Sequence, residues 1–332
     1  MVSVEKLGER KIIYMFLELL EPMPRMPVPF GDDVSAVHIG GGRLAVLKTD
    51  MLVGKTDVPS GMSFWQAARK AVVMNVSDFA AKGVKPLALL VSVGLPRGLK
   101  KENVEQIGEG LNAGAREYGA YVLGGDTNEA SDLIISCSLF GTTKENRLMK
   151  RSGAQPGDWA AVTGLFGKTR SGLKVLLEKL SAPKKIRHSL VNSVFMPHAR
   201  LPEGLALAET NAVTSSIDSS DGLAWSLHEI AKASRVGFQI NHIPTAPETE
   251  EFAKIHSLSP VELTFYGGEE YELVVTVNPK LWGKAERAVK KVGGRLTKIG
   301  TVTKDKRLMF EVEDKTVPIE ARGWEHFKSK RK

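Results

Sequence analysis

The sequence predicts a two-domain protein of mixed α and β structure, with an α+β N-terminal half and an α/β C-terminal half. The chain has 332 residues, which exceeds the usual size of a single domain. Segments with the apolar spacing of helices alternate with short apolar runs that are typical of strands. Residues 142–157 are rich in turn-forming and charged residues, so we expect domains at 1–148 and 149–332.

The composition is that of a globular protein, with 42% hydrophobic and 25% charged residues. The longest apolar run, near 87–91, is too short to cross a bilayer, and no apolar segment of the signal-peptide kind opens the chain. We therefore expect no membrane association. The single cysteine, Cys137, lies in an apolar run and predicts a buried thiol in a reducing, cytoplasmic setting.

The formal net charge of +8 favours an anionic partner, either a nucleotide or a nucleic acid. The basic tail 328–332 supplies part of this charge and reads as a solvated terminus. No nucleic-acid-binding motif accompanies it.

The first half begins with a helix and a hairpin. Apolar residues fit one helix face over 7–20, and the prolines of 22–29 end the helix. Two short apolar runs, 34–39 and 44–48, flank three glycines and predict an antiparallel hairpin. Asp33 precedes the first run and Asp50 follows the second, so the two aspartates are expected to lie close together.

A longer helix is expected over 64–82, because Ser63 suits its N-cap and Gly83 suits the position after its end. Asn75 and Asp78 lie three residues apart on one face of this helix. Such a polar stripe either meets a polar site or faces solvent, and the pair alone does not decide between the two.

The rest of this half predicts a sheet with helices on one side. A helix is expected over 102–117, and strands over 87–93, 121–123 and 133–140. Gly124-Gly125-Asp126-Thr127 would follow directly after the strand 121–123, where glycine permits a ligand to approach the backbone closely.

The second half alternates strand and helix patterns. The expected strands are 159–163, 215–217, 238–240, 273–277, 296–299 and 308–312. The expected helices are 171–180, 204–209, 223–234, 249–255 and 281–292.

Seven of the twelve aspartates lie in five short motifs beside glycine, serine, threonine or asparagine. Carboxylate oxygens suit Mg²⁺, which typically binds through one or two carboxylates plus substrate phosphates. Any one motif could be only a turn or a helix cap, whereas the five together favour metal-dependent phosphate chemistry. The motifs are Gly31-Asp32-Asp33, Thr49-Asp50, Asn75-Val76-Ser77-Asp78, Gly124-Gly125-Asp126-Thr127 and Asp218-Ser219-Ser220-Asp221-Gly222.

Three further segments bear on the chemistry. The segment 218–222 opens a predicted helix, whose free N–H groups suit a phosphate. The segment 164–169 resembles a P-loop, but Val162 stands where its first glycine is required, so it predicts a strand-to-helix turn. The acidic segment 266–273 either recognises a cationic ring or forms a turn before a strand.

Zinc-binding and serine-hydrolase motifs are absent from the sequence. Phosphoryl transfer needs little beyond positioning and charge neutralisation, so no general base is expected.

The ordered series of motifs resembles the thiamine-monophosphate kinases, members of the ATP-binding superfamily that includes aminoimidazole ribonucleotide synthetase. The resemblance runs from Leu7-Gly8-Glu9 to Gly323-Trp324. It implies an N-terminal α+β domain whose mixed sheet forms an intersubunit barrel in a homodimer, and a C-terminal α/β domain. It also implies direct in-line transfer from ATP to a phosphate oxygen of thiamine monophosphate, giving thiamine diphosphate and ADP.

The resemblance further implies roles for particular residues. Several Mg²⁺ ions would be held by Asp33, Thr49, Asp50, Asp78, Asp126, Asp218 and Asp221. Contacts to ATP would come from Gly125, Asp126, Arg151 and Ser220, and contacts to thiamine monophosphate from Asp57, Glu269, Glu270 and Trp324.

The chain departs from the family pattern at three places. Lys55-Thr56-Asp57 stands where many bacterial members have Gly-Val-His, Glu270 replaces an aspartate, and Lys168 replaces an acidic residue. Two alternatives stay open at this point: another ATP-dependent enzyme of the superfamily, of the aminoimidazole ribonucleotide synthetase kind, and a non-catalytic nucleotide- or nucleic-acid-binding protein.

Overall fold

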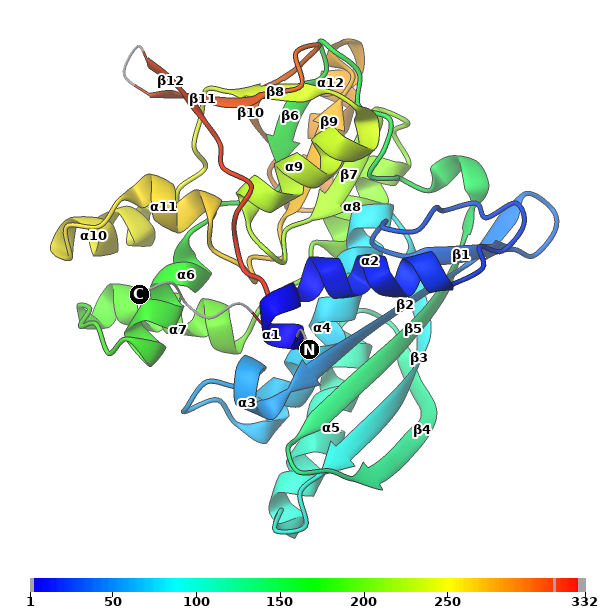
Figure 1. Cartoon of the computed structure of the whole chain (residues 1–332), viewed down its shortest axis with the longest axis vertical. Helices are drawn as coiled ribbons and strands as arrows, with labels where there is room; N and C mark the ends of the chain where they lie inside the picture. The colour runs from blue at the N-terminus through cyan, green and yellow to red at the C-terminus, as the bar shows by residue number, and fades with distance from the viewer. Residues whose placement is uncertain (1–2, 313–314, 328–332) are drawn as a thin grey trace.

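A computed structural model describes residues 3–312 and 315–327 as two mixed sheets with helices packed against them (Figure 1). The basic tail 328–332 lies outside the described residues. In the N-terminal sheet the strand order is β1-β2-β5-β3-β4, with β3 and β4 parallel and the other neighbours antiparallel. The strands are β1 (Ser35–His38), β2 (Arg43–Val53), β3 (Lys85–Leu95), β4 (Tyr121–Glu129) and β5 (Ile134–Lys144).

The helices of this half are α1 (Val4–Leu7), α2 (Glu9–Leu19), α3 (Gly54–Asp57), α4 (Phe64–Lys82) and α5 (Lys101–Glu117), followed by the 3₁₀ turn η1 (Glu145–Arg147). The expected α+β arrangement, with helices on one side of the sheet, is confirmed: α4 packs on the sheet and α5 packs on α4.

Helix α4 lies between the two halves of the molecule (Figure 1). Its boundaries match the prediction, because Ser63 and Gln66 form a capping box and Gly83 takes the left-handed conformation at the C-cap. Neighbouring helices approach it closely through glycine: a Cβ on Gly110 would lie 2.2 Å from a backbone oxygen of α4, and one on Gly204 would lie 2.0 Å from another. One hydrophobic core therefore surrounds α4 and continues into the C-terminal half.

The C-terminal sheet has the strand order β12-β11-β8-β10-β6-β9-β7, with β8 and β11 parallel and the other neighbours antiparallel. Its strands are β6 (Trp159–Val162), β7 (Val213–Asp218), β8 (Gly237–Ile240), β9 (Leu273–Val277), β10 (Thr297–Thr303), β11 (Leu308–Val312) and β12 (Lys315–Pro318).

The helices of this half are α6 (Lys168–Leu177), α7 (Lys184–Phe195), α8 (Leu201–Ala208), α9 (Leu223–Ser234), α10 (Pro247–Ile255), α11 (Pro260–Phe265) and α12 (Trp282–Lys291), with the 3₁₀ turn η2 (Pro279–Leu281).

The structure corrects the sequence-based elements at two places that concern the motifs. Strand β2 continues through Thr49 and Asp50 to Val53, because it pairs with β5 along its whole length. Strand β4 likewise includes Gly124-Gly125-Asp126-Thr127, because β3 pairs with it beyond Leu123. Both motifs therefore lie within strands and not after them. Helices α7 and α11 were not predicted.

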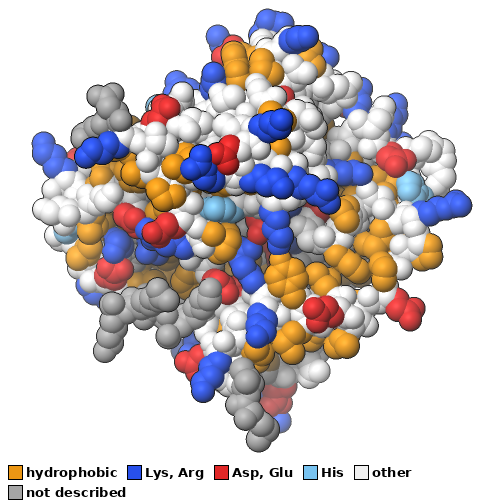
Figure 2. All heavy atoms as spheres, turned by 45° about the horizontal axis from the view of Figure 1, so that its top comes forward, with side chains coloured by type: hydrophobic (Ala, Val, Ile, Leu, Met, Phe, Trp, Pro, Cys, Tyr) orange, Lys and Arg blue, Asp and Glu red, His pale blue; other side chains and the backbone are white. Residues whose placement is uncertain are grey.

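Two surface properties follow from the fold. Among the helices of the described residues, none has the length and apolar character that a bilayer span requires. On the face in Figure 2, Lys and Arg side chains lie in several separate groups with acidic and apolar side chains between them.

Candidate active site

Three buried aspartates meet between the two sheets. Asp33 comes from the loop before β1, Asp78 from α4 and Asp218 from the end of β7, and one carboxylate oxygen of each lies within 4.8 Å of the others. Segments that are far apart in the sequence thus bring three of the predicted metal ligands together. We refer to this group as the aspartate cluster.

Two cations hold Asp33 in place. Lys82 Nζ lies 2.7 Å from Asp33 Oδ2 and 2.6 Å from Asp32 Oδ1, and it also donates a hydrogen bond to the carbonyl of Ser216. Arg151 Nε donates to Asp33 Oδ1 at 2.6 Å. Because of these cations, the pKa of Asp33 lies below its ordinary value although burial acts to raise it.

Asp50 lies beside the cluster, where residues of β2 and α4 contact it. Its backbone N–H donates to Asn75 Oδ1 at 3.0 Å, which accounts for an asparagine in the apolar stretch of α4. Lys48 Nζ lies 3.1 Å from Asp50 Oδ1 and 3.0 Å from Asp78 Oδ2. The polar stripe of Asn75 and Asp78 therefore meets a polar site and not solvent.

The cluster has the properties of a cation site. Burial, followed by the charge of Asp33, raises the pKa of Asp218 to about 7, although Ser77 Oγ donates a hydrogen bond to it at 2.7 Å. Burial also raises the pKa of Asp78 well above its ordinary value. Carboxylates that repel one another in a buried site are stabilised by a divalent ion, and oxygen ligands suit Mg²⁺. The residues present thus fit Mg²⁺.

Two loops beside the cluster are bonded to each other through their backbones. The N–H of Glu269 donates to the carbonyl of Ser220 at 2.6 Å, and the N–H of Tyr271 donates to the carbonyl of Ser219 at 3.0 Å. A Cβ at Gly268 would lie 2.7 Å from the Ser220 oxygen, so glycine permits this close approach. The motifs 218–222 and 266–273 therefore form one hydrogen-bonded unit.

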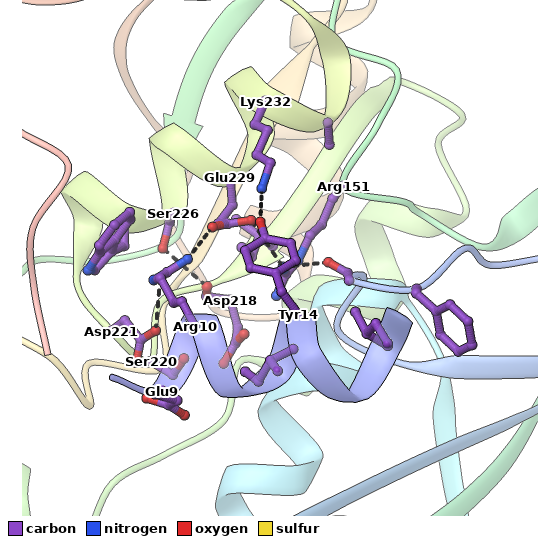
Figure 3. A pocket seen from close by; sticks show the side chains of 17 residues that line it. Glu9, Arg10, Tyr14, Arg151, Asp218, Ser220, Asp221, Ser226, Glu229 and Lys232 are labelled. Carbon is purple, nitrogen blue, oxygen red and sulfur yellow. Dashed lines mark hydrogen bonds and ion pairs between the residues drawn. The ribbon is translucent and has the colours of Figure 1, made fainter. Parts of the chain in front are cut away.

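A cavity of about 500 Å³ lies on one side of this unit (Figure 3). We call it the Arg151 cavity. Helix α2 covers it, and Arg10 reaches across to Glu229 at 2.5 Å and to Asp221 at 3.6 Å. Its polar lining includes Ser220, which the resemblance assigns to nucleotide binding.

A second cavity, of about 350 Å³, lies on the other side. We call it the Trp324 cavity. It is lined by three of the predicted substrate residues, Asp57, Glu269 and Trp324, and it shares Ser220 and Asp221 with the Arg151 cavity. The segment 218–222 therefore lies between the two cavities, and its first residue, Asp218, lines the Arg151 cavity and belongs to the aspartate cluster.

The fourth predicted substrate residue, Glu270, has a different position. Its carboxylate accepts hydrogen bonds from the N–H of Gly167 at 2.6 Å and of Thr169 at 3.2 Å, at the start of α6. Burial raises its pKa to about 8. The segment 164–169 is the predicted strand-to-helix turn, and Glu270 occupies the N–H groups that a P-loop would offer to phosphate.

Three predicted residues of the first half lie away from the cluster. The register of β2, β5, β3 and β4 places Thr49 and Asp126 on the face of the sheet opposite to α4. Thr49 accepts a hydrogen bond from Ser138 there. A Cβ on Gly125 would lie 1.7 Å from the carbonyl oxygen of Val91, so this glycine is required by strand pairing.

Sequence reasoning missed the lysines of the site. Lys48 and Lys82 belong to no recognisable sequence motif. Strand β2 positions the Lys48 ammonium group, and helix α4 that of Lys82, so that each contacts two carboxylates. Lys70, on α4, contacts Glu269 Oε1 at 2.5 Å and was missed for the same reason. For Lys70 and Lys82 the one available signal is a lysine within a largely apolar helix, which is ambiguous without the tertiary structure. Lys48, on β2, has no such signal.

The chain is similar in sequence to known proteins of one family. Residues 31–143 match the family described as AIR synthase related protein, N-terminal domain, and residues 155–313 match its C-terminal domain. The thiamine-monophosphate kinase of Nitrosopumilus maritimus is 38% identical over 283 residues, which cover 85% of this chain and 89% of that protein. The enzyme of the same name from Pyrococcus horikoshii is 37% identical over 325 residues, 97% of each chain.

The chain is also similar to solved structures. The structure described as AaThiL complexed with AMPPCP and TMP is 27% identical, has a TM-score of 0.86, and is matched over 98% of this chain and 99% of that one. The hydrogenase maturation protein HypE from E. coli is 19% identical with a TM-score of 0.70 over 94% of this chain and 97% of that one, and this likeness concerns the fold alone.

Proposed function

Because the chain belongs to the thiamine-monophosphate kinase family, we propose that it transfers the γ-phosphoryl group of ATP to a phosphate oxygen of thiamine monophosphate. The products are ADP and thiamine diphosphate. The observation that carries this proposal is the pair of cavities that share Ser220 and Asp221 beside the aspartate cluster. ATP on one side of the segment 218–222 and thiamine monophosphate on the other would bring their phosphate groups together near the aspartate cluster.

In this proposal the nucleotide occupies the Arg151 cavity, where Arg151 and Ser220 would contact ATP. Gly125 and Asp126 lie on β4, away from this cavity, and would contact ATP from a second copy. Arg151 is held by Asp33 and its Nη1 donates to the carbonyl of Gly31 at 2.7 Å, so its guanidinium is oriented before the nucleotide arrives. A guanidinium is suited to phosphate oxygens because of its planar, forked donors. The relative that holds AMPPCP supports ATP as the donor.

The acceptor would occupy the Trp324 cavity. Thiamine monophosphate carries a positively charged ring, which the Glu269 carboxylate and the aromatic face of Trp324 would recognise. One oxygen of its phosphate forms the new bond to the γ-phosphorus, and the bond from that phosphorus to the β,γ-bridging oxygen breaks, leaving ADP. This oxygen is already ionised near neutral pH, so no residue is needed as a general base.

Several Mg²⁺ ions would be held by Asp33, Thr49, Asp50, Asp78, Asp126, Asp218 and Asp221. When bound, Mg²⁺ neutralises the charge of the two phosphate groups and aligns them. The protein's own contribution is to keep the carboxylates rigid through Lys82, Arg151 and Ser77.

The test is direct. The protein is incubated with MgATP and thiamine monophosphate, and thiamine diphosphate and ADP are measured. We expect equal amounts of both products, and no phosphorylation of free thiamine, since it presents a hydroxyl group in place of a phosphate. ATP consumption that is independent of thiamine monophosphate would contradict the proposal.

The acceptor cavity gives a sharper prediction. In Glu269→Gln the amide no longer offers a charge to a cationic ring, and a charge-assisted contact is worth about 1.5–3 kcal/mol. We therefore expect KM for thiamine monophosphate to rise about 10- to 100-fold while KM for ATP stays unchanged. Steady-state kinetics with each substrate varied separately measures this, and Glu251→Gln on the exposed side of α10 is the control. Equal changes in both KM values would contradict the assignment of the cavity.

We propose that the active form is a homodimer in which the open face of the N-terminal sheet closes a barrel with a second copy. That face exposes Leu47, Met51, Leu90 and Leu123, and a large exposed apolar surface is typical of an interface. Strand β4 is three strand spacings from β2, or about 14 Å, so Asp126 and Thr49, which share the open face, are too far apart to hold one ion within one copy. A second copy would supply Asp126.

This arrangement predicts that two inactive variants complement each other. When Asp126→Ala and Asp218→Ala chains are co-expressed, a mixed dimer has one site with both changes and one intact site. We expect about a quarter of the wild-type activity, because random pairing makes about half of the dimers mixed. Assay of the unfractionated co-expressed protein, against the same total amount of wild type, measures this. No activity above that of the single variants would place both residues in a site of one chain.

Two broader features belong to the proposal. We infer that residues 1–148 carry the metal-binding and dimerisation functions, and that residues 149–332 complete the active site. We also infer a cytoplasmic location, because ATP is the co-substrate and the thiol of Cys137 is buried and unpaired within the described residues.

A further inference from the structure

Lys48 stands among the residues that would hold metal ions, although it is not a metal ligand. It is on β2, two residues before Asp50 and on the same face of the strand, which is the face that packs against α4. Its ammonium nitrogen lies 3.1 Å from Asp50 Oδ1 and 3.0 Å from Asp78 Oδ2. It therefore bridges two carboxylates from different elements.

The other cations of the site are engaged elsewhere. Lys82 pairs with Asp32 and Asp33, and Arg151 pairs with Asp33. Asp218 accepts a hydrogen bond from Ser77. Lys48 is thus the cation that Asp50 and Asp78 share.

An ammonium group and a divalent ion exclude each other at this position. Mg²⁺ takes oxygen ligands at about 2.0–2.1 Å in an octahedral arrangement. The ammonium nitrogen already occupies the space between Asp50 and Asp78 at hydrogen-bonding distance from both. Asp78 also lies near Asp33 and Asp218, since one oxygen of each of these three carboxylates is within 4.8 Å of the others, and a metal ion would be held there.

We propose that Lys48 is a built-in cation of the active site, which takes the place of one divalent ion between Asp50 and Asp78. This inference rests on the proposed function, because it assigns a role within the same metal site. Lys48 supplies one positive charge permanently at this position, and the divalent ions gather on the side of Asp33 and Asp218. The site then binds fewer divalent ions than its number of carboxylates suggests.

The test counts bound ions and does not depend on turnover. Mn²⁺ replaces Mg²⁺, and the free ion is measured by electron paramagnetic resonance in the presence of the protein and AMPPCP. Lys48→Met removes the charge and keeps the length of the side chain. We expect Lys48→Met to bind about one more Mn²⁺ per chain than the wild type does, because Asp50 and Asp78 are freed.

Two controls separate charge from packing. Lys48→Arg keeps the charge and should bind the same number of ions as the wild type, as should Lys85→Met at an exposed position of β3. Lys48→Thr serves as a second neutral variant if Lys48→Met does not fold, which circular dichroism reveals.

The outcomes are distinct. Equal numbers of Mn²⁺ ions in the wild type and in the folded neutral variants would overturn the role of Lys48 while leaving the proposed kinase activity intact. No Mn²⁺ binding by the wild type beyond that of AMPPCP alone would overturn both the metal site and the proposed function. One additional ion in both neutral variants, and none in Lys48→Arg, supports the inference.

Discussion

Asp218→Asn is expected to lower turnover by at least about a thousandfold, the scale on which phosphoryl transfer depends on charge stabilisation. The amide can still accept the hydrogen bond from Ser77, so the local structure persists. What is lost is a charged ligand at the junction of the two cavities. Asp78→Asn should have an effect of similar size, because its carboxylate belongs to the same cluster.

The unfolding free energy of Asp218→Asn is not expected to fall together with its turnover. The pKa of Asp218 is raised from 3.8 to about 7 in the folded protein. Between these values the folded state binds more protons than the unfolded state, so this group's contribution to stability is lost as the pH rises toward 7. At pH 8, without metal, Asp218→Asn should therefore be at least as stable as the wild type. Denaturant unfolding and steady-state kinetics on one preparation measure both effects, with Asp305→Asn as an exposed control.

Unchanged turnover in Asp218→Asn would contradict the proposed role of the cluster. Lower stability together with lower activity would indicate instead that the aspartate supports the fold.

Lys82→Met is expected to cost about 3–5 kcal/mol of unfolding free energy, the usual effect of removing one partner of a buried ion pair. Lys82 is fully buried and serves two carboxylates and a backbone carbonyl. Its loss leaves Asp32 without its nearest cation, whereas Asp33 keeps Arg151. Urea denaturation measures the difference.

Lys85→Met, three residues further along the chain and exposed, is the matched control and should change the unfolding free energy little. A loss below about 1 kcal/mol in Lys82→Met, the range of exposed ion pairs, would contradict the role of Lys82 as a buried cation that stabilises Asp32 and Asp33.

The sequence predicts best where local signals determine the structure. The ends of α4 follow from Ser63 and Gly83, which act within one turn of the helix. Strand β9 was predicted with its observed bounds, because its apolar run is buried along its length. The fold class followed from the same kind of local pattern.

Errors arose where a partner distant in sequence determines the structure. Thr49-Asp50 lies inside β2 because β5 pairs with it, and Gly125 is needed because β3 passes close to it. Nothing in the neighbouring residues signals these pairings.

The residues of the candidate site likewise fall into those that the sequence indicated and those that it did not. The aspartate motifs indicated Asp33, Asp78 and Asp218, since carboxylates beside small residues have a recognisable pattern. Lys48 and Lys82 have no pattern, because a lysine becomes part of the site only when folding surrounds it with carboxylates. Glu270 shows the converse: it belongs to a motif, yet its carboxylate caps α6.

The proposed reaction is a single direct transfer of the γ-phosphoryl group from ATP in one cavity to thiamine monophosphate in the other. The stereochemistry at the transferred phosphorus tests this most directly. ATP made chiral at the γ-phosphorus with a sulfur atom and oxygen isotopes is used with thiamine monophosphate, and the configuration in the thiamine diphosphate product is determined. One in-line displacement inverts the configuration, and inversion is the result that we predict. Retention would require two displacements through a phosphorylated residue, and it would contradict the account.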